Sequence, residues 1–292
     1  MCGHHYHDES DVNSDVKAML ERRHLVQALA AGGALSVAGT SLSGCSTNPE
    51  TGASQLLLIG SSQLNRMAAA SWADAKSTQP VSRDPRYNSR LQTIGDRVSR
   101  GANKHNEQWE YAVFDEDTRN AFVLPGNRVG FYKGMMDFAD NDDQIAAVMG
   151  HEVGHVTGRH AQERVSQQMA GQIGLTTAAV LANGRLNPAT SSLVNAALGV
   201  GYQVGVVLPF SRKHESQSDL LGARYMHNAG YDPYQSVRLW EKMAAEAPSR
   251  QPEILSTHPD PARRARDLHN YIKYQETLGS QGWQSIQLPR SS

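Results

Sequence analysis

The chain has 292 residues, and its 28 lysines and arginines against 29 aspartates and glutamates give a formal net charge of −1. This balance provides no basic excess, which argues against nucleic acid as a partner. The sequence has two cysteines, Cys2 and Cys45, and no internal repeat. Residues 46–292 are enough for one sizeable domain with a full apolar core, and they contain no cysteine to form a disulfide.

The first 45 residues have the pattern of a secretory signal. Residues 19–24 are basic, residues 25–39 are apolar and rich in Ala and Gly, and Leu42-Ser43-Gly44-Cys45 closes the segment. An apolar core this short is typical of a signal peptide rather than of a membrane span. Because the preceding residues do not fit a signal, Met19 is an alternative start.

Leu42-Ser43-Gly44-Cys45 also resembles the bacterial lipobox, in which the cysteine is lipidated and becomes the first residue. The resemblance implies a lipid anchor on Cys45, and the alternative is an ordinary signal with an incidental cysteine. Ser46, rather than aspartate, follows the cysteine, which in similar lipoproteins favours the outer membrane. We therefore expect a lipoprotein of the cell envelope at the periplasmic face of the outer membrane.

The next segments are predicted as helices with a few strands. Residues 46–60 are predicted as a tether with turns. Helices are predicted over 62–76 and 87–100, each with an apolar side at helical spacing, and Pro85 is placed in the loop between them. Three segments are predicted as strands, the last two joined in a hairpin: 109–114, 121–124 and 128–132.

An edge strand of this small sheet is a candidate for binding extended peptide through main-chain hydrogen bonds. One candidate edge consists of Asn120, Ala121, Phe122 and Val123, and the other of residues 129–132. The alternative is an internal hairpin without a ligand, and the residues alone leave both open.

His151-Glu152-Val153-Gly154-His155 has the pattern H-E-x-x-H within a predicted helix. Two histidines four residues apart leave a helix on the same face, as two ligands of one Zn²⁺ require. Glu152, beside the first histidine, is then placed to act as general base for a water. The alternative is a pair of surface histidines on an amphipathic helix.

This helix is predicted to begin after Asn141, with Gln144 at the capping-box position, and to continue through Val165. On such a helix His160 lies about 140° from His155 and is expected not to be a ligand. Residues 166–210 are rich in Ala, Gly, Val and Leu. We expect them to form helices over the active-site helix, with a membrane-dipping hairpin as the minor alternative because polar residues interrupt them.

A catalytic zinc site needs a third protein ligand. Ser211 is predicted to cap a second helix that ends near Gly230 and carries Glu215 and Asp219 on one face. Glu215 is the candidate third ligand, and Asp219 is a candidate to fix the tautomer of a ligand histidine. A solvated acidic face is the common alternative for such carboxylates. His214 is expected to face outward.

H-E-V-G-H followed by R-H, with R-K-H-E-S-Q-S-D about 60 residues later, resembles the HtpX-like zinc metallopeptidases, which are related to the CAAX-prenyl endopeptidases. Two further segments resemble elements of that family: residues 120–126, N-A-F-V-L-P-G, and residues 256–259, S-T-H-P, with Arg264 after them. The resemblance covers about residues 46–275 and favours Glu215 as a ligand. It implies an α+β fold, a mostly helical zincin-like domain with a small β-sheet beside the HExxH helix.

The resemblance also implies one Zn²⁺ per subunit on His151, His155 and Glu215. Glu152 would take the proton of the attacking water and deliver it to the leaving amine.

Two further roles come from the resemblance alone. His258 would hydrogen-bond the oxyanion of the intermediate, or would fill the fourth zinc position in a resting state. Arg264 would orient a carboxylate near the site. The alternatives are a helix-capping histidine and a surface arginine.

Together these expectations describe a zinc metalloendopeptidase that cleaves unfolded or misassembled envelope proteins, with the outer-membrane assembly machinery as a candidate partner. The expected organisation comprises a 1–45 extension and signal, a 46–60 tether, a 61–275 metallopeptidase domain and a 276–292 tail. One alternative is a periplasmic chaperone or assembly factor for outer-membrane proteins with hydrolysis secondary. A structural zinc protein is disfavoured because only three ligands are evident.

Overall fold

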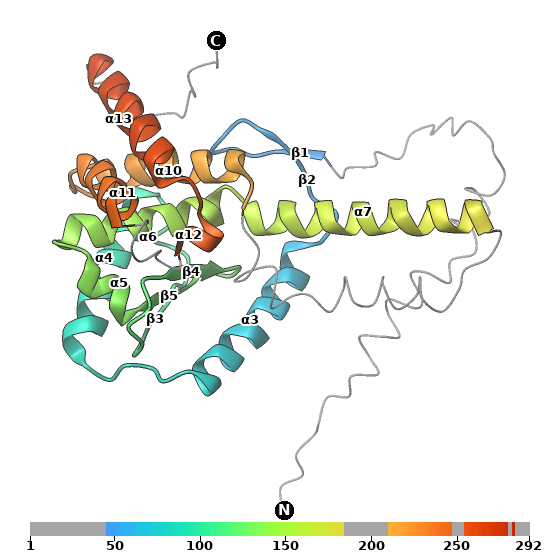
Figure 1. Cartoon of the computed structure of the whole chain (residues 1–292), viewed down its shortest axis with the longest axis horizontal. Helices are drawn as coiled ribbons and strands as arrows, with labels where there is room; N and C mark the ends of the chain where they lie inside the picture. Colours follow the sequence, from blue (N-terminus) through green and yellow to red (C-terminus); the bar gives the residue numbers. More distant parts are fainter. Residues whose placement is uncertain (1–44, 184–209, 247–253, 280–281, 284–292) are drawn as a thin grey trace, which may run out of the picture. The chain divides into compact units, whose positions relative to one another are not determined.

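The computed structural model describes residues 45–183, 210–246, 254–279 and 282–283 (Figure 1). The predicted α+β class is confirmed, because helices make up most of the described chain and surround a three-stranded sheet.

The first two helices are α3 (Ser61–Thr78) and α4 (Pro85–Gly101), close to their predicted ranges. The placement of Pro85 in the preceding loop was wrong, since it is the first residue of α4. Asp84 caps this helix by accepting a hydrogen bond from Arg86 N at 2.9 Å. Proline is tolerated at the first helical position because the N–H there has no partner within the helix.

The main sheet contains β3 (Glu110–Phe114), β4 (Ala121–Leu124) and β5 (Arg128–Tyr132) in the order β3-β5-β4. β4 and β5 form the predicted antiparallel hairpin, and β3 lies parallel to β5. Gly126 and Asn127 turn the chain between them with φ of 82° and 62°, a conformation that these two residue types adopt most readily. Because β5 is central, its prediction as a peptide-binding edge was wrong, whereas β4 lies at one edge of the sheet and β3 at the other.

The next two helices are α5 (Lys133–Phe138) and α6 (Asp142–Thr157), and α6 carries the H-E-x-x-H sequence. Asn141 caps α6 by accepting a hydrogen bond from Gln144 N at 3.0 Å. The Gln144 side chain accepts from Asp140 N at 2.9 Å, rather than from the Asn141 N–H of a regular capping box. Almost every residue of α6 is buried.

The prediction that this helix continues through Val165 was wrong, because α6 ends at Thr157. Arg159 has a φ of 55°, and a separate helix, α7 (His160–Asn183), begins directly after it. Gly158 is required at the break, since a Cβ there would lie 2.4 Å from His160 Nε2.

The two faces of the sheet are covered by different helices. Alternate residues of a strand point to opposite sides, and on one side Val113, Val123 and Phe131 join the main core with α4, α6 and the later helices. On the other side Phe114, Phe122 and Tyr132 surround Trp72 of α3. The H-E-x-x-H helix therefore packs on one face of the sheet, next to the edge strand β4.

The remaining described helices are α10 (Arg212–Asn228), α11 (Tyr234–Glu246), α12 (Ile254–Thr257) and α13 (Pro261–Thr277). Ser211 caps α10 as predicted, accepting a hydrogen bond from His214 N at 3.2 Å. α10 crosses α6 at very short range. A Cβ added to Gly150 would lie 2.9 Å from Gly222 O, and one added to Gly154 would lie 2.8 Å from Ser218 O.

Residues 46–60 were predicted as a tether, but they are docked on the body of the protein. β1 (Cys45–Thr47) and β2 (Ser54–Leu56) form an antiparallel hairpin. The buried Asn48 donates from Nδ2 to Thr157 O at 3.0 Å, and Gln55 donates from Nε2 to Gly158 O at 2.6 Å. These side chains satisfy carbonyls at the end of α6 that have no partner within the helix, which holds the hairpin in place.

Most of residues 166–210, including nearly all of the apolar stretch 193–210, lie outside the described residues, as does the signal region before Cys45. Among the helices that the structure does describe, none combines the length and apolar character needed to cross a bilayer. At the other end, α13 extends to Thr277, and Trp283 stacks on His227 with ring centres 4.4 Å apart.

Candidate metal centre

The two histidines of α6 present their ring nitrogens to each other. His151 Nε2 and His155 Nε2 lie 3.0 Å apart, and both side chains are buried. Burial holds the pKa of His155 well below its usual range, so the ring is neutral and offers a lone pair.

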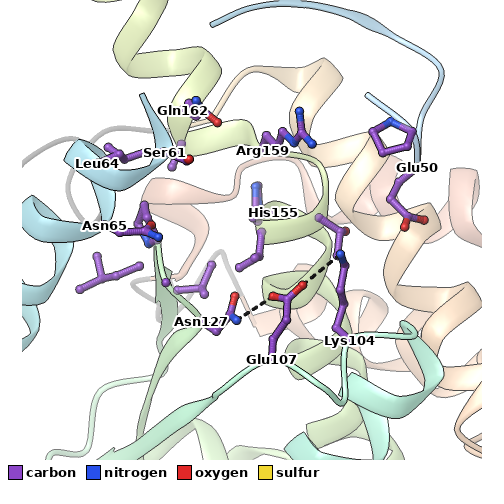
Figure 2. Close-up of a pocket in the computed structure, with 18 of the residues that line it drawn as sticks. Glu50, Ser61, Leu64, Asn65, Lys104, Glu107, Asn127, His155, Arg159 and Gln162 are labelled. Atoms are coloured by element: carbon purple, nitrogen blue, oxygen red, sulfur yellow. Dashed lines mark hydrogen bonds and ion pairs between the residues drawn. The ribbon is translucent and has the colours of Figure 1, made fainter. Parts of the chain in front are cut away.

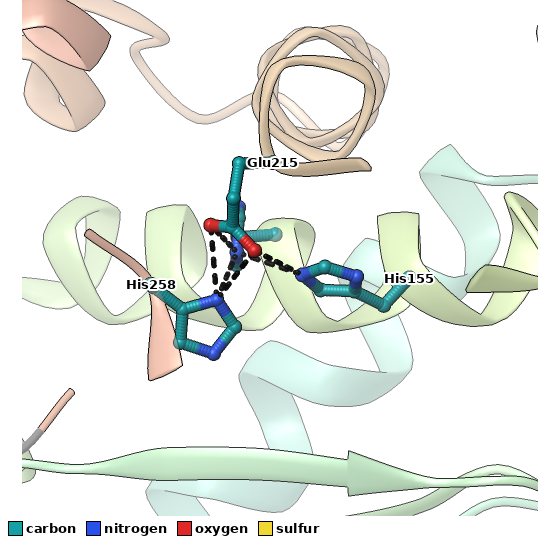
Figure 3. A group of neighbouring side chains, drawn as sticks. His155, Glu215 and His258 are labelled. Atoms are coloured by element: carbon teal, nitrogen blue, oxygen red, sulfur yellow. Dashed lines mark hydrogen bonds and ion pairs between the residues drawn. The ribbon is translucent and has the colours of Figure 1, made fainter. Parts of the chain in front are cut away.

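Glu215 reaches the same point from the first turn of α10 (Figure 3). Its carboxylate oxygens lie 3.5 Å from His151 Nε2 and 3.5 Å from His155 Nε2. Ser218 fixes the two helices together by donating from Oγ to His151 O at 2.7 Å. The close crossing of α6 and α10 thus places the carboxylate opposite both histidines.

His258, directly after α12, completes a group of four donors with His151, His155 and Glu215, all of whose ligand atoms lie within 4.8 Å of one another. His258 Nδ1 lies 3.1 Å from His151 Nε2 and 3.0 Å from each oxygen of Glu215. Four atoms at tetrahedral corners about 2.0–2.1 Å from a zinc ion are about 3.3–3.4 Å apart. The observed separations and the nitrogen and oxygen donors therefore fit an ion of this kind.

Glu152 is buried beside the donor group. Its Oε1 has no hydrogen-bond partner in the part of the chain that the structure describes, and it lies 3.7 Å from His258 Nε2. Burial raises the pKa of this carboxyl. A carboxylate with an unused lone pair and a pKa moved towards neutrality can accept a proton and return it.

Asp219 and Arg264 support the donor group from behind. Asp219 Oδ1 lies 2.9 Å from His151 Nδ1, the ring nitrogen that faces away from the other donors. Arg264 donates from Nε to Asp219 Oδ2 at 2.8 Å, and its NH1 lies 3.2 Å from Glu215 Oε2. Although burial raises the pKa of Asp219, Arg264 holds it below its usual range. Trp240 packs against the guanidinium at 3.4 Å from its ring centre.

Two histidines lie where the sequence did not place them. His160 is outside the donor group, but it begins α7 and lies with its Nδ1 2.9 Å from His155 Nδ1. The prediction that His214 faces outward was wrong, since this residue is buried and stacked on His160 with ring centres 4.5 Å apart. Both differences follow from the break between α6 and α7. Gly158, directly after α6, is a local signal for that break, but the helix was predicted to continue past it and past the left-handed Arg159.

A cleft of about 460 Å³ opens beside His155 (Figure 2). Its walls include Val123 and Leu124 of β4, Leu64 and Asn65 of α3, and Phe210. The predicted peptide-binding strand therefore borders the cleft. Of its four residues, Ala121, Phe122 and Val123 lie in β4, and Asn120 immediately precedes it.

Cys45 is exposed, its thiol is free, and it begins strand β1.

A buried set of histidine and carboxylate donors on two crossed helices, with a second buried glutamate beside them, is the arrangement of a metallopeptidase. The chain belongs to peptidase family M48, which residues 85–272 match. This result agrees with the family resemblance read from the motifs.

Similar curated proteins carry peptidase names. A beta-barrel assembly-enhancing protease from Yersinia pestis is 29% identical over 216 residues, covering 71% of this chain and 44% of the relative. The protein of the same name from Escherichia coli K12 is 29% identical over 229 residues, covering 77% of this chain and 47% of the relative. The mitochondrial metalloendopeptidase OMA1 of Schizosaccharomyces pombe is 34% identical over 169 residues, covering 56% of this chain and 47% of the relative. The chain thus spans less than half the length of these relatives.

Proposed function

We propose that this chain is a zinc-dependent metalloendopeptidase that hydrolyses peptide bonds in unfolded or misassembled envelope proteins. The observation that carries the proposal is the meeting of the donor atoms of His151, His155 and Glu215 beside the buried Glu152, whose Oε1 accepts no hydrogen bond from the described residues. A buried carboxylate oxygen that accepts no hydrogen bond is costly to keep, and a proton-transfer role at a metal site accounts for it.

His151, His155 and Glu215 would hold one Zn²⁺. A bound zinc ion supplies a Lewis acid that polarises a peptide carbonyl and makes water more acidic. Glu152 accepts the proton of the attacking water and delivers it to the leaving amine, for which its raised pKa is suited. Asp219 accepts the Nδ1–H of His151, which keeps the Nε2 lone pair directed at the donor group.

His258 has two roles open to it, as a hydrogen-bond donor to the oxyanion or as a fourth ligand at rest. The position of its Nδ1 within the donor group supports the resting ligand. Arg264 acts through its partners, since it contacts both Asp219 and Glu215 and holds the two carboxylates in place.

Extended substrate would pair with the edge strand β4, whose residues Val123 and Leu124 border the cleft. Main-chain pairing binds peptides with little regard to sequence, which suits a protease of unfolded chains.

We infer a site of action at the periplasmic face of the outer membrane, through a lipid on Cys45. The lipobox-like residues before Cys45 support this inference, and so does the exposure of Cys45 itself. The relatives named beta-barrel assembly-enhancing protease also favour an envelope role, with the outer-membrane assembly machinery as a partner.

The test is digestion of casein by a fragment of residues 46–292, comparing the parent sequence with Glu152→Gln and measuring zinc in both. We expect both proteins to hold one zinc, and the variant to cleave about 10²–10⁴-fold more slowly. Equal rates would contradict the role of Glu152. Absence of cleavage by both zinc-loaded proteins would contradict an unregulated endopeptidase.

A periplasmic chaperone or assembly factor is the second candidate function, because the edge strand β4 and its cleft would bind unfolded segments without cutting them. In cells, Glu152→Gln separates the two functions. Full complementation by this variant would make binding the primary role, and loss of complementation would make hydrolysis the primary role.

A further inference from the structure

The ring nitrogen of His155 that faces away from the donor group has a partner of its own. His155 Nδ1 lies 2.9 Å from His160 Nδ1, and both residues are buried. Two ring nitrogens at this distance share one proton, so one of them donates and the other accepts.

The chemistry of the centre decides which nitrogen donates. A neutral imidazole that offers the lone pair of Nε2 carries its hydrogen on Nδ1. His155 Nδ1–H must then donate to His160 Nδ1, and the hydrogen of His160 must lie on Nε2. That nitrogen has an acceptor ready, since Gln217 Oε1 lies 3.1 Å away.

The ring of His160 also packs against a second histidine. One face stacks on His214, with ring centres 4.5 Å apart and planes 15° apart. His214 Nε2 lies 3.3 Å from the buried Glu163 carboxylate, which also accepts a hydrogen bond from Gln55 Nε2 at 2.8 Å. The β1–β2 hairpin therefore takes part in fixing the ring that faces His155.

We propose that His160 is a positioning residue for His155 and that Gln217 sets the tautomer of His160. This inference rests on the proposed zinc function. The two histidines of H-E-x-x-H are then oriented by different chemistry, a carboxylate behind His151 and a neutral imidazole behind His155. The imidazole fixes the ring without adding a negative charge to a buried site that already contains three carboxylates, those of Glu152, Glu215 and Asp219.

The first test is Zn²⁺ affinity of the full chain, measured by competition with a chromophoric chelator. His160→Leu removes the acceptor and should weaken zinc binding about 10–100-fold. His160→Asn keeps an acceptor oxygen near the place of Nδ1 and should recover most of that loss. His105→Leu, a change at an exposed histidine, is the control and should bind zinc as the parent does. Parent-like affinity in His160→Leu would overturn the proposal.

The second test needs no variant and therefore does not depend on the fold of His160→Leu. Nitrogen-15 NMR of histidine-labelled, zinc-loaded protein reports which ring nitrogen of each histidine carries hydrogen. We expect hydrogen on Nδ1 of His155 and on Nε2 of His160, and the reverse pattern at His160 would overturn the assignment. Failure of the parent chain to bind zinc would overturn the proposed function and this role together. Tight zinc binding by the parent that is equally tight in His160→Leu would overturn only this role.

Discussion

The crossing of α6 and α10 sets the distance between the histidines and Glu215, so a small change there tests how the fold builds the site. A Cβ added to Gly222 would lie 2.9 Å from Gly150 C and 2.9 Å from His151 N. These are backbone atoms and cannot rotate aside. Because ordinary contacts begin near 3.4 Å, Gly222→Ala must separate the helices by about 0.5 Å.

Two effects on stability oppose each other in this variant. Overpacking costs about 1–3 kcal/mol, and alanine gains about 1 kcal/mol over glycine within a helix. The net loss is therefore about 0–2 kcal/mol, and the protein should still fold. The separation of the helices exceeds the tolerance of about 0.2 Å in metal–ligand distances. Zinc affinity should consequently fall about 10–100-fold, as when an outer hydrogen-bond partner is lost.

The assay pairs chelator competition for zinc with urea denaturation of the metal-free chain. The matched control is Gly171→Ala, at an exposed position of α7 where an added Cβ meets nothing within 4 Å. The control should gain slightly in stability and bind zinc normally. Equal zinc affinities for the two variants would refute the reasoning.

Three further variants test other buried contacts by urea denaturation. Arg264→Met leaves Asp219 without its cation and should cost about 3–5 kcal/mol, so a loss below about 1 kcal/mol would contradict the buried pair. Gln55→Ala removes a donor from Glu163 and should cost about 1–3 kcal/mol, whereas no loss would show that the hairpin is not held as described. Burial raises the pKa of Tyr271 from 10.0 to about 12, so its contribution to stability is full below pH 10 and is lost as pH rises towards 12. Tyr271→Phe removes a hydroxyl that has no partner among the described residues, so the variant should be as stable as the parent at pH 8. Its free energy of unfolding should fall less than that of the parent between pH 10 and 12, and an equal fall would contradict this account.

Local signals predicted the helices and strands well, because caps and apolar spacing act within a few residues. Ser211 and Asn141 both cap the helices predicted for them. Two of the errors concern partners that are distant in the sequence. The burial of Asn48 depends on carbonyls more than 100 residues away, and the central place of β5 depends on its pairing with β3.

The residues of the site also divide into those that local spacing predicts and those whose place depends on long-range packing. His151 and His155 share a face by helical periodicity alone, so the sequence could pair them. Glu215 could be selected over other carboxylates on predicted helices only through the family resemblance, because spacing does not reveal which helices cross. His160 was misplaced because the predicted helix continued past Gly158, which follows the last residue of α6, and past the left-handed Arg159.

The central claim is that His151, His155 and Glu215 hold a metal ion beside Glu152. The most direct measurement is an anomalous difference map from crystals of the zinc-loaded chain, with data recorded on both sides of the zinc absorption edge. The account predicts one strong peak bounded by His151 Nε2, His155 Nε2 and the Glu215 carboxylate. A peak at another site, or none here in protein that contains one zinc per chain, would contradict it.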